Sequence, residues 1–268
     1  MYEFHGDKRR YFDMTRQVTE EYIIPYLKES FPLSPETRVL EIGCGEAGVL
    51  KAFTDLGCQT FGIELEESRL EFARQFMAEE LKAGKVQFLN KDIYDVNVQT
   101  DIGEAFDLVI LKDVIEHIPD QAKFMPQLHK LLKPGGRVFF AFPPWYMPYG
   151  GHQQVLPGKA ASRLPWYHLL PGPMYPGMLK LLGMPANSIA TMLEIRSTGI
   201  SIQRFEKICR NSGFAIESRR FYLFNPIYKF KFGIRPRLQN KLVAGIPRLR
   251  DFFTMGMYYI VKPAEKTA

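Results

Sequence analysis

The chain has 268 residues, 46% of them hydrophobic and 24% charged, a composition that fits a globular protein with a large core. No segment approaches the roughly 18 consecutive apolar residues of a transmembrane helix, and the first ten residues lack the apolar stretch of a secretory signal. The three cysteines, Cys44, Cys58 and Cys209, are widely spaced, which argues against a disulfide framework or a zinc site. We therefore expect a cytoplasmic protein.

The formal net charge of +6 hides a strong asymmetry between the two halves. Residues 1–142 contain 17 Lys and Arg against 24 Asp and Glu, a net charge of −7. Residues 143–268 contain 18 against 5, a net charge of +13. Such a division predicts that the second half meets something acidic, either a substrate, a membrane surface or nucleic acid.

The first 36 residues are expected to form a helical segment, with apolar periodicity over 11–31 and a kink at Pro25. From 37 to 142, apolar runs alternate with amphipathic stretches. We expect strands at 38–42, 60–64, 86–90, 106–112 and 136–142, and helices at 46–57, 66–83 and 120–132. This alternation predicts a parallel sheet covered on both faces, with ligands bound at the carboxyl ends of its strands.

The segment 143–200 differs in composition, because it is rich in proline and aromatic residues, contains both tryptophans and has few charges. We expect an inserted cap over the active site; an irregular segment packed on the sheet edge is the alternative. Residues 201–268 should form a helix up to Gly213, strands at 214–224 and 255–262, and a basic segment between them. The whole chain would then be a single domain.

A glycine-rich turn, Gly43-Cys44-Gly45, follows the first expected strand and precedes a helix, and Glu64 closes the next strand. Glycines let the backbone approach a ligand closely, and a carboxylate at the end of the second strand can accept hydrogen bonds from ribose hydroxyls. The spacing also fits a dinucleotide site, so it is weak evidence by itself. Glu41, inside the strand before the turn, suits a ligand with an ammonium and a sulfonium and would repel a pyrophosphate.

Two downstream segments, residues 106–118 around Asp113-Val114-Ile115-Glu116-His117 and residues 131–138 around Lys133-Pro134-Gly135-Gly136, follow in order. With the glycine turn they resemble the class I methyltransferases that use S-adenosylmethionine (SAM), especially the small-molecule branch with the quinone-biosynthesis enzymes. The resemblance covers roughly residues 37–142. It implies a Rossmann-like fold with a mostly parallel seven-stranded sheet and an antiparallel C-terminal strand.

The resemblance also implies which residues bind SAM. The turn would hold the methionine moiety, Glu64 with Leu65 the ribose, Asp92-Ile93 the adenine, and the backbone at Lys112 the amino-acid group. Other interpretations remain open: Asp92 could cap a helix, Glu41 could pair with a basic side chain, and the side chain of Lys112 could point away from the sulfonium.

Methyl transfer requires alignment of donor and acceptor, exclusion of water and, for a hydroxyl or amine acceptor, removal of a proton. His152 and His117 are the candidate bases, since a neutral imidazole can accept a proton; both could instead order their loops. A mostly apolar acceptor pocket with a few polar groups is expected from four residues near His152: Trp145, Tyr146, Tyr149 and Gln153. We expect no metal site, because Glu116-His117 alone offers too few ligands.

The segment 221–250 has seven basic residues and no acidic ones, with aromatic residues interleaved in its first part. It could be a solvated basic face or could engage an anionic or acyl-bearing substrate, a carrier protein or a membrane surface. Nucleic-acid binding is less favoured, because no known RNA-binding module flanks it.

The predicted function is transfer of a methyl group from SAM to a small, partly apolar acceptor, more often at oxygen than at nitrogen or carbon. Two alternatives use the same residues differently. The first is an NAD-dependent oxidoreductase that uses the glycine turn, and the second is a non-catalytic membrane-binding or nucleic-acid-binding protein with a vestigial SAM fold.

Overall fold

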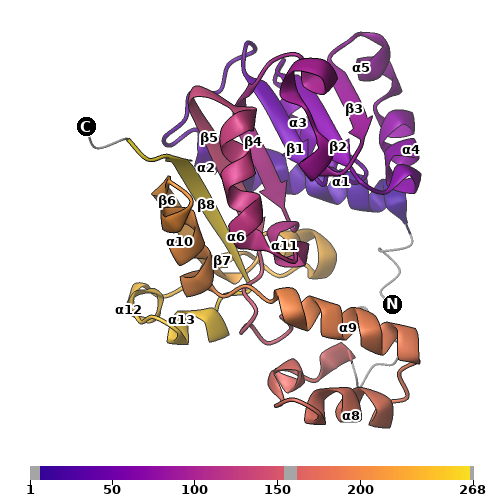
Figure 1. Ribbon diagram of the computed structural model, residues 1–268, viewed down its shortest axis with the longest axis vertical. Coiled ribbons are helices and arrows are strands. Elements are labelled where there is room, and N and C mark those ends of the chain that lie inside the picture. Colours follow the sequence, from indigo (N-terminus) through magenta and orange to yellow (C-terminus); the bar gives the residue numbers. More distant parts are fainter. Residues whose placement is uncertain (1–6, 154–161, 266–268) are drawn as a thin grey trace.

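A sheet of eight strands runs through the protein in the computed structural model, which describes residues 7–153 and 162–265 (Figure 1). The strand order is β3-β2-β1-β4-β5-β8-β6-β7. The first five strands pair in parallel, and β8 pairs antiparallel with both β5 and β6. The strands are β1 Arg38–Ile42, β2 Gln59–Glu64, β3 Val86–Asn90, β4 Phe106–Lys112, β5 Leu132–Phe142, β6 Phe214–Phe224, β7 Arg237–Leu238 and β8 Gly256–Pro263.

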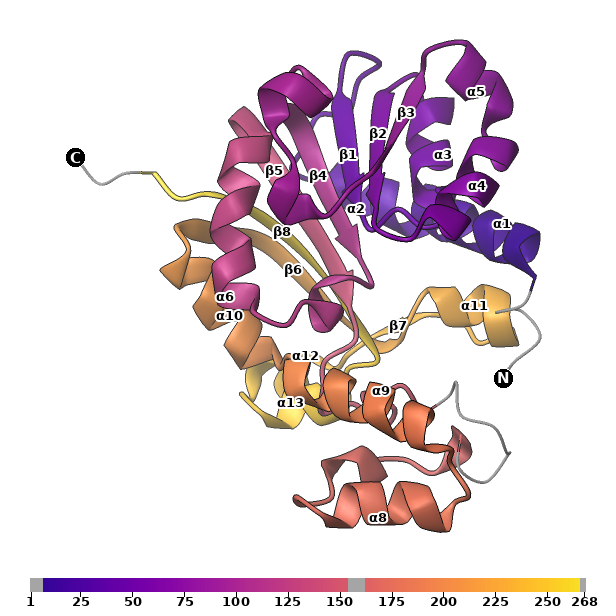
Figure 2. The same cartoon turned by 45° about the vertical axis from the view of Figure 1, so that its right-hand side comes forward.

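Helices pack on both faces of the sheet, because its strands are apolar on both sides (Figure 2). One core lies under α6 and α10, and a second lies under α2 and α3. The helices of the first half are α1 Lys8–Val18, α2 Ile24–Leu27, α3 Gly48–Asp55, α4 Glu67–Phe76, α5 Ala78–Lys82 and α6 Gln121–Phe124.

The fold agrees with the predicted Rossmann-like architecture, with three local differences. The expected helix over 66–83 is interrupted at Met77, whose φ of −116° and ψ of 31° are not helical. The expected helix over 120–132 continues after Phe124 as a 3₁₀ helix, Met125–Leu131, where Pro126 removes a backbone donor. The edge strand β7 brings the total to eight strands in place of the expected seven.

The N-terminal helix departs from regular α-helical bonding just before Pro25. Between α1 and α2 lies a π-helical turn, Thr19–Ile23, in which the N–H of Ile24 donates to the carbonyl of Thr19. Proline lacks the N–H that would continue regular α-helical bonding at this point. Helix α1 packs against α3.

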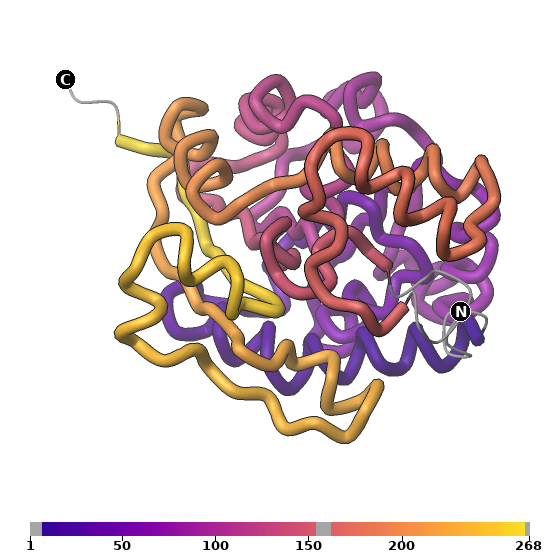
Figure 3. Tube along the Cα trace, turned by 90° about the horizontal axis from the view of Figure 1, so that it is seen from below, coloured from indigo at the N-terminus to yellow at the C-terminus, as the bar shows by residue number. Residues whose placement is uncertain are grey.

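The second half of the chain is more irregular. A 3₁₀ turn, Tyr167–Leu169, and helices α8 Met174–Leu181 and α9 Ala186–Thr198 form a subdomain with its own small apolar cluster. Helix α10, Ile202–Asn211, leads into β6. Between β6 and β8 the chain inserts α11 Ile227–Phe232, β7, α12 Lys241–Gly245 and α13 Leu249–Phe252. Seen from below in Figure 3, the α8–α9 subdomain and the α12–α13 insertion lie beside each other at one end of the molecule.

Among the described residues, no helix is both long enough and apolar enough to cross a membrane.

Candidate active site

A cleft of about 560 Å³ opens at the carboxyl ends of β1, β2 and β4, where parallel sheets bind ligands. Of the nine predicted cofactor residues, eight line it: Glu41, Gly43, Cys44, Glu64, Leu65, Asp92, Ile93 and Lys112. The ninth, Gly45, lies in the same turn with a φ of +53°. A Cβ at Gly45 would lie 2.2 Å from Nη2 of Arg69. The positive φ favours glycine at this position, and a side chain there would displace the guanidinium of Arg69 from over the turn.

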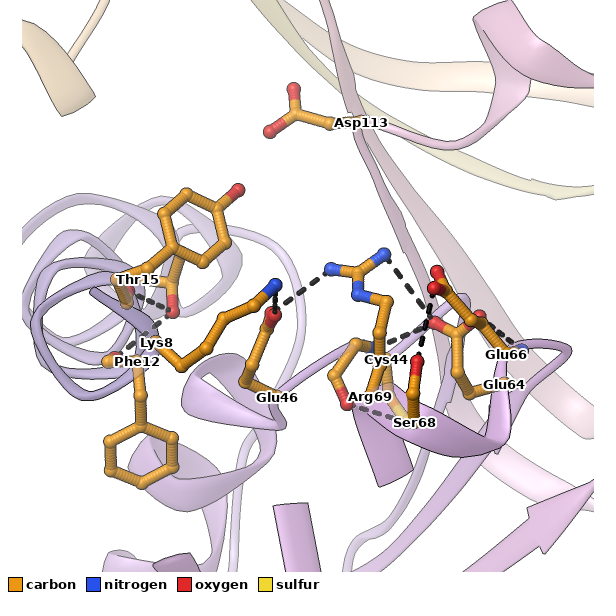
Figure 4. A network of polar contacts seen from close by, with 12 residues as sticks. Lys8, Phe12, Thr15, Cys44, Glu46, Glu64, Glu66, Ser68, Arg69 and Asp113 are labelled. Atoms are coloured by element: carbon orange, nitrogen blue, oxygen red, sulfur yellow. Dashed lines mark hydrogen bonds and ion pairs between the residues drawn. The ribbon is translucent and has the colours of Figure 1, made fainter. Parts of the chain in front are cut away.

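A polar network fixes the turn (Figure 4). Oε2 of Glu64 accepts a hydrogen bond from the Gly45 N–H at 2.9 Å, and its Oε1 accepts one from the Glu66 N–H at 3.1 Å. Arg69 reaches over the turn, with Nη1 3.7 Å from Glu64 and Nη2 3.0 Å from Glu46. Glu64 thus holds the glycine turn while its carboxylate faces the cleft.

Glu46 is a second buried carboxylate at this cleft. Burial opposes its ionisation, but hydrogen bonds from Arg69 and Lys8 outweigh that cost and lower the pKa of Glu46. Lys8 comes from α1 and donates at 2.7 Å. An ion pair therefore ties the N-terminal helix to the cofactor turn.

Glu41 provides a test of whether SAM fits. Its Oε2 is buried and has no hydrogen-bond partner among the described residues, and burial raises the pKa of this carboxyl well above its usual range. The charges of Lys112 and Arg69 favour the ionised carboxylate but do not outweigh burial, and a ligand ammonium would add a direct partner for Oε2. The cleft fits the amino-acid end of SAM, and an ion pair to Glu41, the alternative interpretation, is not found among the residues that the structure describes.

At the far side of the cleft, Asp92 accepts a hydrogen bond from the Tyr94 N–H at 3.0 Å. The expected cap role is therefore present, and Asp92 also lines the cleft. The Lys112 ammonium lies 2.5 Å from Asp113, and although burial opposes its charge, this partner raises the pKa of Lys112. The side chain of Lys112 is thus neutralised beside the cleft.

A second cavity, of about 190 Å³, adjoins the cofactor cleft. Four residues line both spaces: Tyr11, Lys112, Asp113 and His117. The rest of the wall is mostly apolar or aromatic, with contributions from β5, the loop after it, α11 and β8. A molecule in this second cavity would lie next to one in the cleft.

His117 and His152, the two predicted bases, meet in this cavity. Their rings stack with centroids 4.9 Å apart. Burial lowers the pKa of both imidazoles, that of His152 to about 4. Both are therefore neutral at pH 7 and able to accept a proton.

Glu116 completes a cluster with these histidines, since one ligand atom from each of the three lies within 4.8 Å of the others. Burial, followed by the charge of Asp113, raises the pKa of Glu116 well above its usual range, and its Oε2 has no hydrogen-bond partner among the described residues. The expectation that Glu116-His117 lacks a further ligand is wrong, because the fold adds His152. Mixed nitrogen and oxygen ligands of this kind can hold a divalent cation.

Of the predicted acceptor-binding residues, Tyr149 lines the second cavity, whereas three others lie outside its wall. Gln153 is fully buried and donates to Nδ1 of His168 at 3.0 Å. Trp145 packs edge-on against His168, and Tyr146 lies against Phe252. These residues support the loop that carries His152.

Sequence reasoning did not single out four residues that line the two spaces: Tyr11, Glu46, Arg69 and Lys231. Tyr11 and Lys231 lie far from the motifs in sequence. Asp113, which the sequence places beside Lys112 at the end of a strand, lines both spaces and has a φ of +55°, unusual for a residue with a side chain.

This arrangement defines the class of the protein: a SAM-dependent methyltransferase of the class I fold. A family model described as "Methyltransferase domain" matches residues 33–168, and the chain belongs to that family. This match does not support the alternative of an NAD-dependent oxidoreductase.

Named relatives match the same core. The chain is 34% identical over 104 residues to a ubiquinone biosynthesis O-methyltransferase of Thiobacillus denitrificans, covering 39% of this chain and 43% of the relative. A protein of the same name from Coxiella burnetii is 26% identical over 118 residues, covering 44% and 48%. The matches therefore span less than half of these relatives.

Solved structures resemble the chain over a greater length. A SAM-dependent methyltransferase from Clostridium acetobutylicum superposes with a TM-score of 0.56 at 13% identity, covering 92% of both chains. The magnesium protoporphyrin IX methyltransferase of Synechocystis, solved with bound S-adenosylhomocysteine, gives 0.53 at 16% identity, covering 92% of this chain and 83% of that one. At such identities the likeness shows the fold.

Proposed function

We propose that this protein transfers a methyl group from SAM to a hydroxyl oxygen of a small, partly apolar acceptor. The observation that carries the proposal is the second cavity, which shares a wall with the cofactor cleft and contains two neutral histidines. The similarity of the core to O-methyltransferases favours oxygen as the methylated atom.

SAM supplies a methyl group on an already activated sulfonium. The residues of this chain then have three tasks. Glu41 and the glycine turn hold the amino-acid end, Glu64 and Leu65 the ribose, and Asp92 and Ile93 the adenine.

The stacked histidines accept the hydroxyl proton. His117 lines both spaces and His152 lines the acceptor cavity. Because both imidazoles are neutral at pH 7 and their rings stack, the pair receives the proton as the oxygen attacks, and loss of either ring disrupts the pair. Tyr149 and the apolar wall would hold the acceptor, while Trp145, Tyr146 and Gln153 position the His152 loop.

In our proposal the acceptor carries an anionic group, and Lys231 binds that group. Lys231 on α11 lines the acceptor cavity, and burial lowers the pKa of its ammonium to about 8, so that the group remains mostly charged at pH 7. A desolvated cation in a largely apolar cavity favours an acceptor with a carboxylate on an aromatic ring.

The segment 143–200 would act as the cap. Its helix α9 packs against the 3₁₀ turn that carries His117, and Gln121 Nε2 donates to the carbonyl of Thr198 at 2.7 Å. These contacts join the subdomain to the reaction centre, which supports a role in excluding water.

A second mode of activation is favoured by the buried, unpartnered oxygen of Glu116 beside the two histidines. A divalent cation held there would polarise the hydroxyl oxygen. Dialysis against EDTA followed by Zn²⁺ or Mn²⁺ distinguishes the two modes, because imidazole ligands suit these cations better than Mg²⁺. Loss and recovery of turnover assign the cluster to a cation, whereas unchanged turnover assigns it to proton transfer by histidine.

The proposed function is tested with radiolabelled SAM and two phenolic probes, protocatechuate and catechol, beside titrations with S-adenosylhomocysteine and NADH. We expect S-adenosylhomocysteine to bind and label to appear on the hydroxyl of protocatechuate. Tight binding of NADH without a response to S-adenosylhomocysteine would contradict the proposal.

A further inference from the structure

The insertion between β6 and β8 has an inverted pattern of burial. Its buried positions carry polar side chains, namely Gln239, Arg250, Asp251 and Thr254. Its exposed positions carry large apolar side chains, namely Leu238, Leu242, Ile246, Leu249 and Phe253. A loop that served only to connect two strands would be expected to turn its leucines inward.

The buried polar residues anchor the insertion to α10. Asp251 accepts a hydrogen bond from the Ile202 N–H at 2.9 Å, at the start of that helix. Arg250 donates to Glu206 at 3.0 Å, and Gln239 Nε2 donates to the carbonyl of Arg250 at 2.9 Å. These bonds fix one side of the insertion, so that its apolar side is held toward solvent.

The apolar side chains come from adjacent elements. Helices α12 and α13 contact each other, and both views of the ribbon show them together beside α10 at one end of the molecule (Figures 1 and 2). Leu242 on α12 is 80% exposed, and Leu238 precedes that helix on the edge strand β7. We call these five side chains, with the cations described next, the α12–α13 surface.

Positive charge accompanies the apolar side chains. Arg237, Lys241 and Arg248 are exposed within the same stretch, and residues 221–250 contain no acidic residue. Aliphatic side chains surrounded by cations match the boundary of an anionic bilayer, where apolar groups enter the headgroup region and cations meet lipid phosphates.

Other partners fit this surface less well. A second copy of the chain packed through the same surface would bring the same cations together, because such an interface is symmetric. Single-stranded nucleic acid is bound by stacking on aromatic rings, whereas four of the five apolar side chains here are aliphatic. We therefore propose that the α12–α13 surface docks the protein on membranes that contain anionic lipid.

The same insertion also lines the acceptor cavity, through Asn225, Ile227, Tyr228, Lys231 and Met255. The inference does not depend on the proposed reaction, because it concerns vesicle binding alone.

Sedimentation with vesicles tests whether the α12–α13 surface binds anionic membranes. The full-length protein should bind vesicles of phosphatidylcholine with phosphatidylglycerol, bind pure phosphatidylcholine weakly, and lose binding as salt is added. Leu242→Asp should weaken binding to the mixed vesicles by about tenfold, because it replaces an inserted side chain with a charge that anionic lipid repels.

Leu81→Asp is the control, since Leu81 on α5 is 38% exposed and α5 lies at the opposite end of the molecule from α12 and α13 (Figure 1). It should bind vesicles as the wild type does, and both variants should retain affinity for S-adenosylhomocysteine, which shows that they fold. Three results would overturn the proposal: no vesicle binding by the wild type, equal losses in the two variants, or a dimer that only Leu242→Asp dissociates without any vesicle binding.

Discussion

The halves 37–142 and 143–268 differ in how they build their sites. The first half repeats strand and helix, and its ligand residues follow consecutive strand ends, so the cofactor cleft depends on local sequence. The second half combines a small helical subdomain, a loop with His152 and an insertion that brings Lys231 to the acceptor cavity. The donor site is thus made by a regular pattern, whereas the acceptor site is assembled from distant segments.

The strongest test of this contrast is removal of the stacked imidazoles. His117→Ala and His152→Ala should each lower kcat for protocatechuate by about 10²- to 10⁴-fold, as expected for loss of a general base. Affinity for S-adenosylhomocysteine, measured by calorimetry, should hardly change for His152→Ala. His129→Ala is the control, because that ring packs on Phe214 outside both cavities; a comparable loss there would point to a general effect on folding.

The loop that carries His152 should be sensitive to acid. His168 Nδ1 accepts from Gln153, and its Nε2 lies 2.8 Å from the Trp145 carbonyl. Burial lowers the pKa of His168 from 6.5 to about 4. The unfolded chain therefore takes up the proton first, so this contribution to stability is complete above pH 6.5 and is lost as the pH falls toward 4.

The corresponding change in the free energy of unfolding is on the order of 3 kcal/mol for His168. Urea unfolding at pH 7.5 and pH 5 should capture about 2 kcal/mol of this change, because the loss is complete only below pH 4. His168→Asn, which cannot titrate in this range, should show a smaller difference between the two pH values. An equal difference would assign the acid sensitivity to other groups.

In the cofactor half, Glu64→Ala should weaken S-adenosylhomocysteine binding by roughly 1.5–3 kcal/mol, the range for hydrogen bonds to a charged group. Part of that loss would come from the turn, because Glu64 also accepts from the Gly45 N–H. Glu67→Ala is a suitable control, since Glu67 pairs with Arg74 on the surface of α4. Unchanged affinity in Glu64→Ala would place the ribose elsewhere.

The smallest expected effect concerns acceptor charge. Lys231→Met should raise KM for protocatechuate by about tenfold and leave KM for catechol nearly unchanged, since only protocatechuate carries a carboxylate. Lys229→Met provides the comparison, because Lys229 pairs with Glu21 on the surface. Equal changes in KM for protocatechuate and catechol would contradict the proposal that Lys231 binds an anionic group of the acceptor.

The sequence predicted the sheet and eight of the residues that line the cofactor cleft, because both depend on local patterns. Apolar runs mark the strands, and glycine readily adopts the positive φ found at Gly43 and Gly45. Cleft residues whose place depends on how α1 and α4 pack, among them Tyr11, Glu46 and Arg69, could not be predicted in this way.

The acceptor cavity could not be predicted to the same extent. Tyr11 reaches it because α1 packs against α3, and Lys231 because α11 packs near α1. The aromatic residues at 145 and 146 suggested a pocket wall, but Trp145 packs on His168 instead. Such long-range contacts leave no periodic signal in the sequence.

The central claim is that the first half builds the donor cleft, whereas the acceptor cavity also needs residues of the second half, and a double-variant cycle tests it most directly. S-adenosylhomocysteine affinity and KM for protocatechuate would be measured for Glu64→Ala, Lys231→Met and the double variant. We predict that the first change affects only the donor affinity, the second only the acceptor KM, and that the two effects add. If Lys231→Met weakened S-adenosylhomocysteine binding as much as Glu64→Ala does, the division into donor and acceptor sites would be contradicted.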